Sequence, residues 1–475
     1  MSTRQFQYFC VHGHYYQPPR GNPVTGHIGF ESEAGDYRNW NERITAEAYR
    51  PNAEIGNFDR ISFDLGDPLL SWLRRRAPET YARILKADAE NLNQKGVGNA
   101  LGSIFHHAIM PLLKRREKRT MLYWGNVAFQ HHFNRRTNGV WLPEMAVDLE
   151  TLQEVEMAGY QFTILSQSQI NEPVEGAGPY WVSLDNGKYL AVFVRNDELS
   201  NDLSFNISAT GGAGHWARNR LASRRKGLLT LVAVGGETFG HHHIGEERFL
   251  HWLLSHEARS IGYKVVTLTE MMRDFPPTEL VTIKPFTTYN ANTLQHWTNG
   301  WKSYLWRAFD HLSAMIDELY LDAMHGLGVN PWRVSDHFVY VWLNQMTGPE
   351  LLAEFMPGLD SEHESRILAL LNARFYMGKS YTSNGFEPYR FNSPQSRFNI
   401  ANAALAIELA EAATGIGLSS SFRNNLLLVV DDESRLNGAQ VYDSVLEEFR
   451  ISEVAPVPSI EPIPEEALLE ESEIV

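Results

Sequence analysis

The chain has 475 residues, of which 43% are apolar, 12% aromatic and 21% charged, which excludes a mainly disordered or collagen-like protein. Its net charge of −15 argues against polyanionic partners, so we expect it to bind neither nucleic acid nor an anionic membrane surface. The single cysteine, Cys10, excludes an internal disulfide bond. Because neither a signal-peptide pattern nor an apolar run near the roughly 18 residues of a membrane helix is found, we expect a cytoplasmic protein.

Short apolar runs alternate with helical patterns through the first 285 residues. The runs that predict strands are 8–12, 61–65, 139–142, 162–165, 189–194, 228–234 and 263–268. Helical patterns separate them, for example over 78–87 and 148–157. Buried strands spaced by helices are typical of a parallel sheet, and seven of them are most simply closed into a barrel. We therefore predict an α/β barrel domain over residues 1–285.

The pattern changes near residue 286, where helical segments replace the strand-like runs. Helices are predicted over 297–324, 349–374 and 399–414, so residues 286–450 are expected to form a mainly helical domain. The tail over 451–475 holds seven Glu and four Pro but no Lys or Arg, which predicts disorder.

Polar residues gather where the predicted strands end. His12 and His14 end the first run, Glu144 follows the third, Asp197 follows the fifth, and Glu237 follows the sixth. Parallel α/β folds place their active sites at the carboxyl ends of their strands. The clustering of these side chains therefore favours a functional site at that edge.

Glu144 and the segment around the first two histidines are the simplest candidates for chemistry. Segment 11–19 packs two histidines, two tyrosines and a glutamine, all of them hydrogen-bonding groups, at a strand end. Glu144 follows Pro143, whose fixed φ holds it in position to act as a nucleophile or an acid–base group. An ordinary exposed loop glutamate is the alternative.

A third segment, 234–243, places a glycine pair before Glu237 and three histidines. Its spacing fits no nucleotide-binding fingerprint, and no lysine follows. Two interpretations stay open: the histidines bind sugar hydroxyls, or they join His12 and His14 as ligands of a metal ion.

Four short segments carry a family resemblance by their order and separation. They are His-Tyr-Tyr-Gln-Pro at 14–18, the segment 98–112, Trp-Leu-Pro-Glu at 141–144 and the segment 231–240. Together they resemble the ordered signatures of glycoside hydrolase family 57, and the match spans most of 6–415. The Gly-Glu-Thr-Phe-Gly-His-His-His ending resembles a less characterised branch with its own C-terminal helical region.

The resemblance implies a fold and a mechanism. The fold is a (β/α)7 barrel, a distorted relative of the TIM barrel, followed by a helical domain. The activity is retaining hydrolysis or transfer on α-glucans or maltooligosaccharides, with Glu144 as the nucleophile and a second carboxylic acid as the acid/base. Residues expected to face the substrate are His12, His14, Gln17, His107, Trp141, Asp197 and His241. Neither a metal nor another cofactor is implied.

One position departs from the family pattern. The acid/base of the fourth signature is the Asp directly before Gly-Glu, and here that place is taken by Gly235. Glu237 is the obvious substitute, although in an extended segment it would lie about 6.5 Å further along. Asp197 and Asp202 are other candidate donors.

The missing acid leaves two classes of function open. The first is an α-glucan hydrolase or glucanotransferase with impaired or relocated acid/base chemistry. The second is a catalytically inactive glucan-binding or regulatory protein that keeps the sugar-contacting cleft. The sequence does not decide whether Gly235 is natural or a change from Asp at this position. It also decides neither hydrolysis against transfer or branching, nor substrate length and linkage, nor oligomeric state.

Overall fold

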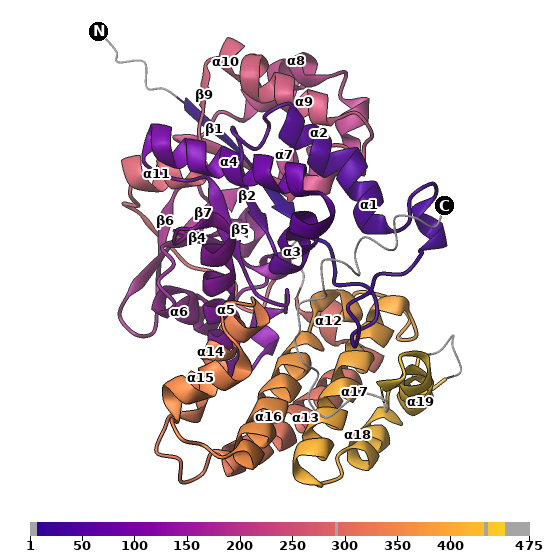
Figure 1. Cartoon of the computed structure of the whole chain (residues 1–475). Coiled ribbons are helices and arrows are strands. Elements are labelled where there is room, and N and C mark those ends of the chain that lie inside the picture. The colour runs from indigo at the N-terminus through magenta and orange to yellow at the C-terminus, as the bar shows by residue number, and fades with distance from the viewer. Residues whose placement is uncertain (1–6, 290–292, 432–435, 452–475) are drawn as a thin grey trace. The chain divides into compact units, whose positions relative to one another are not determined.

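The computed structural model describes residues 7–289, 293–431 and 436–451. The tail predicted to be disordered lies outside these residues, apart from Ile451. The chain divides into two compact units, one of residues 1–19 with 29–294 and one of residues 20–28 with 295–475 (Figure 1). Among the described helices, none has both the length and the apolar character required to cross a lipid bilayer.

The first unit is built on a curled sheet of parallel strands. In spatial order these are β7 (Tyr189–Arg195), β5 (Phe162–Ser166), β4 (Gly139–Trp141), β3 (Ala100–Ser103), β2 (Ser62–Leu65), β1 (Gln7–Tyr15) and β8 (Leu229–Gly235). A hydrogen bond of 2.8 Å from the Asn196 amide to the Leu231 carbonyl bridges β7 and β8, where the ladder is interrupted. The expected distorted (β/α)7 barrel is confirmed.

Three short strands lie outside this ring. β6 (Tyr180–Ser183) runs antiparallel to β7 and pairs with β10 (Leu280–Val281), and β9 (Tyr263–Val265) pairs with the start of β1. The strand predicted over 263–268 is therefore present only over 263–265, and it pairs in parallel with β1 at the edge of the ring. The next helix begins at Leu268, directly after Thr267, whose backbone is still extended and whose side chain caps the helix in a capping box with Glu270.

The true third barrel strand, β3, was missed because it lacks an apolar run. Its sequence is Ala-Leu-Gly-Ser, and small residues are required there. A Cβ added to Gly102 would lie 3.0 Å from the Thr137 side chain and 3.1 Å from the Tyr160 ring. Because neighbouring side chains approach this strand closely, it carries small residues and lacks the β-branched residues on which strand prediction depends.

Helices surround the barrel and connect its strands. They are α1 (Trp40–Ile44), α2 (Arg50–Glu54), α3 (Asp67–Arg76), α4 (Pro78–Lys95), α5 (Arg115–Phe133), α6 (Leu149–Met157), α7 (Asp197–Asn206), α8 (Ala213–Trp216), α9 (Glu247–Trp252), α10 (Ala258–Ser260) and α11 (Leu268–Asp274). The helices predicted at 78–87 and 148–157 correspond to α4 and α6. Inside the barrel, Phe162, Phe193 and Leu231 belong to one buried apolar cluster.

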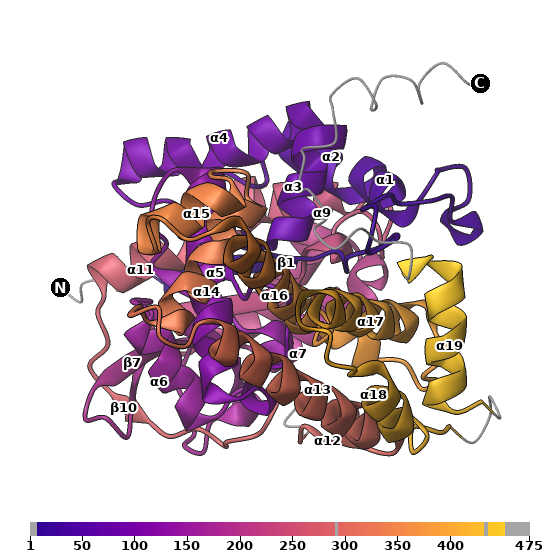
Figure 2. The same cartoon turned by 60° about the horizontal axis from the view of Figure 1, so that its bottom comes forward.

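The described part of the second unit contains helices and no strand, as predicted. They are α12 (Gln295–Thr298), α13 (Trp301–Ala323), α14 (Pro331–Trp342), α15 (Gly348–Phe355), α16 (Ser361–Lys379), α17 (Pro394–Thr414), α18 (Ser419–Leu426) and α19 (Gly438–Glu448). Figure 2 shows α16 beside α17, whose alanines permit close packing. The helix predicted over 349–374 is broken near Gly358, which has a φ of 85°.

Candidate active site

Backbone strain marks the carboxyl ends of β3 and β4. His106 and His107 follow β3 with φ values of 44° and 52°, and Glu144 and Met145 follow β4 with values of 57° and 51°. A non-glycine residue pays roughly 1–2 kcal/mol in this left-handed region, and such residues cluster at functional sites. Four of them at one edge of the barrel support the site that the strand-end residues predict.

Asp64, near the end of β2, is the polar centre of this edge. Its fully buried carboxylate contacts His12 Nε2 at 3.1 Å and His14 Nδ1 at 2.9 Å, and it accepts a hydrogen bond of 2.6 Å from Ser103 Oγ. Burial alone raises the pKa of Asp64. The adjacent His14 and the hydrogen bonds from both histidines outweigh burial and hold that pKa well below its usual range. Asp64 is therefore a carboxylate.

A stack of rings orders the two histidines of β1. Trp141 lies against both, with ring centroids 5.0 Å from His12 and 4.8 Å from His14. Tyr16 stacks on His107 at 3.7 Å, and His107 Nε2 lies 3.1 Å from His14 Nε2. Because His12 is completely buried behind this stack, its side chain supports Asp64 and Trp141 from within the barrel.

Glu237 is buried just beyond β8, in a turn that spans Gly236–Thr238. Its Oε1 accepts hydrogen bonds from Tyr49 Oη at 2.7 Å and from the Tyr16 amide at 3.2 Å. Gln17 donates in turn to Tyr49 Oη at 2.9 Å. Burial raises the pKa of Glu237, and the hydrogen bond from Tyr49 offsets only part of that rise.

The backbone at Gly235 does not require glycine. Its φ of −58° and ψ of 129° suit any residue, and a Cβ built there would meet only Glu237 Oε2, at 3.8 Å. Gly236 is different, because a Cβ there would lie 2.2 Å from the Tyr15 ring. The expectation that an extended segment carries Glu237 about 6.5 Å away is wrong, since the turn brings its carboxylate back over Gly235.

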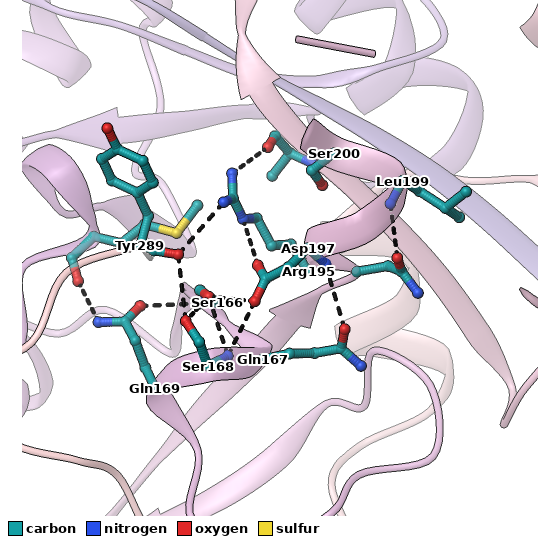
Figure 3. Close-up of polar contacts among 12 residues, drawn as sticks. Ser166, Gln167, Ser168, Gln169, Arg195, Asp197, Leu199, Ser200 and Tyr289 are labelled. Atoms are coloured by element: carbon teal, nitrogen blue, oxygen red, sulfur yellow. Dashed lines mark hydrogen bonds and ion pairs between the residues drawn. The ribbon is translucent and has the colours of Figure 1, made fainter. Parts of the chain in front are cut away.

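Asp197 is held by hydrogen bonds from several elements, as Figure 3 shows. Its Oδ2 accepts from Ser166 Oγ at 2.7 Å and from the Ser168 amide at 3.0 Å, and its Oδ1 accepts from Arg195 Nε at 2.9 Å. These contacts give Asp197 a structural task. Its contact with a sugar stays a prediction.

Arg195 extends this network to the nucleophile candidate. Its Nη1 donates to the Ala233 carbonyl at 3.0 Å and its Nη2 to the Tyr289 carbonyl at 3.5 Å (Figure 3). The Tyr289 amide donates to the Glu144 carbonyl at 3.2 Å. One side chain thus connects the ends of β7 and β8 with the backbone of Glu144.

The remaining candidates lie apart from Asp64 and its partners. His241 Nδ1 lies 2.5 Å from Glu47 Oε2, and His243 Nε2 bonds the Ser204 carbonyl at 2.9 Å. Asp202, a candidate proton donor, accepts from Trp216 Nε1 at 2.7 Å. Across residues 7–289, 293–431 and 436–451, no three His, Cys, Asp or Glu side chains are placed to hold a metal ion. The ligand set of the metal interpretation is therefore not brought together.

Two residues of the site escaped sequence reasoning. Asp64 lies in the run Ile-Ser-Phe-Asp-Leu, where a charged residue inside an otherwise buried strand was the available signal. Tyr49 lies in a helical segment far from β8 in the sequence, and nothing in its local pattern indicates a contact with Glu237.

With the geometry in place, comparison with known families identifies the chain. The family model described as "Glycosyl hydrolase family 57" matches residues 26–284, more than half of the chain. The chain therefore belongs to glycosyl hydrolase family 57. A second model, "Domain of unknown function (DUF3536)", matches residues 297–457. A search of curated proteins finds no match.

Solved structures share the fold at low sequence identity. A maltose-forming exo-amylase from Pyrococcus sp. ST04 is 16% identical, with a TM-score of 0.72 over 93% of this chain and 83% of the amylase. A branching enzyme from Pyrococcus horikoshii is 15% identical, with a TM-score of 0.58 over 96% of this chain and 97% of the enzyme. A 4-α-glucanotransferase from Thermococcus litoralis is 16% identical, with a TM-score of 0.56 over 86% of this chain and 60% of the enzyme.

Proposed function

We propose that the chain is a retaining α-glucan-active enzyme in which Glu144 is the nucleophile and Glu237 supplies the acid that Gly235 lacks. One observation carries the proposal: Oε2 of Glu237 lies 3.8 Å from the position of a Cβ on Gly235. An Asp carboxylate at 235 would occupy the same neighbourhood. The family's acid position is therefore served by a carboxyl group from two residues further along.

The environment of Glu237 suits a general acid. Such a group must keep its proton near neutral pH, and burial raises the pKa of Glu237. Tyr49 and the Tyr16 amide fix Oε1, which leaves Oε2 on the side of Gly235. A carboxyl group held by one oxygen presents the other in a defined direction.

The reaction then follows the double displacement of retaining glycosidases. Glu237 protonates the leaving glycosidic oxygen while a Glu144 oxygen attacks the anomeric carbon, giving a glycosyl ester and an ionised Glu237. Glu237 next removes a proton from water or from an acceptor sugar, whose oxygen displaces Glu144. The enzyme is thereby returned to its starting protonation.

The substrate class rests on the family and its neighbours. The similar structures are an amylase, a branching enzyme and a glucanotransferase, all of them proteins that act on α-linked glucose chains. Maltooligosaccharides are therefore the substrates to test. His14, His107, Gln17, Trp141 and His241 remain proposed substrate-facing residues.

Two substrates separate the two carboxyl roles. A maltooligosaccharide leaves as an alkoxide unless it is protonated, whereas an α-maltosyl fluoride releases fluoride without an acid. We expect Glu144→Gln to lose turnover of both substrates. Glu237→Gln should lose maltooligosaccharide turnover by about 10²–10⁴-fold and retain the first release of fluoride, one per enzyme molecule, because only the second step then lacks its base. Unchanged maltooligosaccharide turnover in Glu237→Gln would overturn the assignment.

The absence of a side chain at Gly235 also supports a second candidate, a glucan-binding protein without turnover. In that case the natural chain and Glu144→Gln would bind maltooligosaccharides with equal affinity, and neither would react with the fluoride. Calorimetric titration beside the kinetic assay distinguishes this outcome.

A further inference from the structure

We propose that Asp64 holds His14 as an imidazolium, and that His14 is the fixed counter-cation of the site, stabilising ionised Glu144 before the glycosyl-enzyme forms and ionised Glu237 after it. The charge assignment stands on the hydrogen-bond network around buried Asp64, supported by the opposite pKa shifts of His14 and His107. The catalytic part rests on the function proposed above, and the experiments below separate the two.

The buried carboxylate of Asp64 needs a compensating positive charge or hydrogen bonds. A fully buried carboxylate is costly unless a cation or several hydrogen bonds compensate it. Ser103 gives Asp64 one neutral hydrogen bond and its other partners are His12 and His14, so a compensating positive charge resides on one of these two rings.

His12 is excluded by its second nitrogen. Nε2 contacts Asp64, while Nδ1 is buried and has no hydrogen-bond partner in the described part of the chain. If Nδ1 were protonated, the charged ring would have a buried N–H donor without an acceptor, and the desolvation of that group would not be compensated. Burial accordingly lowers the pKa of His12. We assign His12 as neutral, with its proton on Nε2.

His14 has hydrogen-bonding groups at both nitrogens. Nδ1 lies within 3.1 Å of both Asp64 oxygens and must carry a proton, because a carboxylate only accepts. Nε2 faces His107 Nε2 at 3.1 Å, a distance at which the two nitrogens share one proton. Burial and the neighbouring His14 lower the pKa of His107, whereas the pKa of His14 is raised against burial, chiefly by Asp64. We therefore assign the shared proton to His14, whose positive charge the ion pair with buried Asp64 favours.

His14 lies on the same face of the sheet as Glu237 and within electrostatic reach of both proposed catalytic carboxyl groups. In the parallel ladder of β1 and β8, His14 pairs with Gly235, and paired residues point to the same face of a sheet. Glu237 Oε2 lies over Gly235 on that face. Glu144 and Glu237 both raise the pKa of His14, so both carboxyl groups lie within its electrostatic reach.

The reaction moves one negative charge around this fixed cation. Before attack Glu144 is ionised and Glu237 is protonated. Once the proton has gone to the leaving oxygen and Glu144 has become an ester, Glu237 carries the charge. A permanent imidazolium within electrostatic reach of both groups stabilises either arrangement without reorganising, as preorganised electrostatic catalysis requires.

The charge of His14 is measured first in the natural chain, by nitrogen-15 NMR of labelled histidines across pH 5–9, with His14→Gln used to assign its signals. The titratable groups facing His14 are His12, Asp64, His107, Glu144 and Glu237. We expect two protonated nitrogens on His14 at pH 7 and one on His12. A neutral His14 at pH 7 overturns the proposal without reference to any activity.

Two variants test the part played by Asp64. Asp64→Asn removes the charge with little change of shape and should lower the pKa of His14 enough to reduce its protonated fraction at pH 8 at least tenfold. Ser103→Ala is the matched control, since it removes one hydrogen bond to Asp64 but leaves the carboxylate. It should leave His14 charged. Equal behaviour of the two variants would assign Asp64 a merely structural role. If Asp64→Asn fails to fold, the titration of the natural chain still decides the charge.

Kinetics test the catalytic part. Asp64→Asn should lower kcat for both the maltooligosaccharide and the fluoride by about 10–100-fold with little change in KM, since the cation acts on charge and not on leaving-group protonation. Asp64→Glu, which keeps the charge, should recover part of kcat. An unchanged kcat in Asp64→Asn with a discharged His14 refutes the catalytic part. A charged His14 in a chain that turns over neither substrate refutes the proposed function and leaves the charge assignment standing.

Discussion

Oε2 of Glu237 lies 3.8 Å from the position that a Cβ on Gly235 would occupy. Gly235, where the family resemblance implies an Asp, and the carboxyl group proposed to substitute for it are therefore neighbours in space, although a turn separates them in the sequence. This distance supports the proposal that the acid group of the site has moved from position 235 to Glu237 and has not been lost.

The two glycines before Glu237 should respond oppositely to substitution. Gly235→Ala should gain about 0.4–1 kcal/mol, because its backbone conformation suits alanine, the space around it is open and the unfolded chain loses entropy. Gly236→Ala should lose about 1–3 kcal/mol, because its Cβ would overlap the Tyr15 ring. Thermal and urea unfolding of the pair measure both effects, and equal losses would show that the turn geometry is wrong.

The pH at which the proposed acid Glu237 loses its proton should depend on Tyr49. Its hydroxyl donates to Glu237 and so favours the ionised carboxylate, which lowers the pKa of Glu237. Tyr49→Phe removes that hydrogen bond, so the pKa should rise and the fall of kcat/KM on the alkaline side should move to higher pH. Tyr160→Phe, which deletes another buried hydroxyl, is the control. A shift toward lower pH would contradict the assignment.

The network around Asp197 should act through the position of Glu144. Asp197→Asn weakens the hold on Arg195, which bonds the Tyr289 carbonyl, and Tyr289 in turn bonds the Glu144 carbonyl. We expect kcat to fall by at least tenfold with little change in KM, together with faster hydrogen exchange at the Tyr289 amide. Glu198→Gln, one residue along, removes a surface pair with Arg224 and should change neither quantity.

Replacing Glu144 by glycine should relieve the strain of its left-handed backbone conformation and so raise the free energy of unfolding. Glu144→Gly relieves roughly 1–2 kcal/mol of left-handed backbone strain and gives back about 0.5–1 kcal/mol as added unfolded-state entropy. The free energy of unfolding should therefore rise by up to about 1.5 kcal/mol while turnover is lost. Glu90→Gly, in the middle of helix α4, should instead lose about 1 kcal/mol. A marked loss of stability in Glu144→Gly would show that the strain is not stored there.

Much of the fold could be predicted because barrel strands are buried on both faces and read as continuous apolar runs. β3 escaped because close packing at Gly102 selects small residues. The strand-end rule located Glu144, Glu237 and His14 correctly at one edge of the barrel.

The contacts that give those residues their chemistry could not be predicted. Asp64 approaches His14 from another strand and Tyr49 approaches Glu237 from a helical segment, so neither contact leaves a local pattern. The distance from Glu237 to Gly235 depends on one turn, and an extended backbone was the wrong model for it. The spacing of residues along a chain reveals neither long-range packing nor the conformation of a turn.

Turnover of maltooligosaccharides by Glu237→Gln, alone and combined with Gly235→Asp, tests the central claim most directly. The account predicts a loss of about 10²–10⁴-fold in the single variant and recovery of at least tenfold in the double variant, because the new carboxyl group enters the space beside the lost one. Full activity in Glu237→Gln would contradict the claim that Glu237 is the acid. Failure of Gly235→Asp to restore any activity would contradict the claim that the two positions serve the same space.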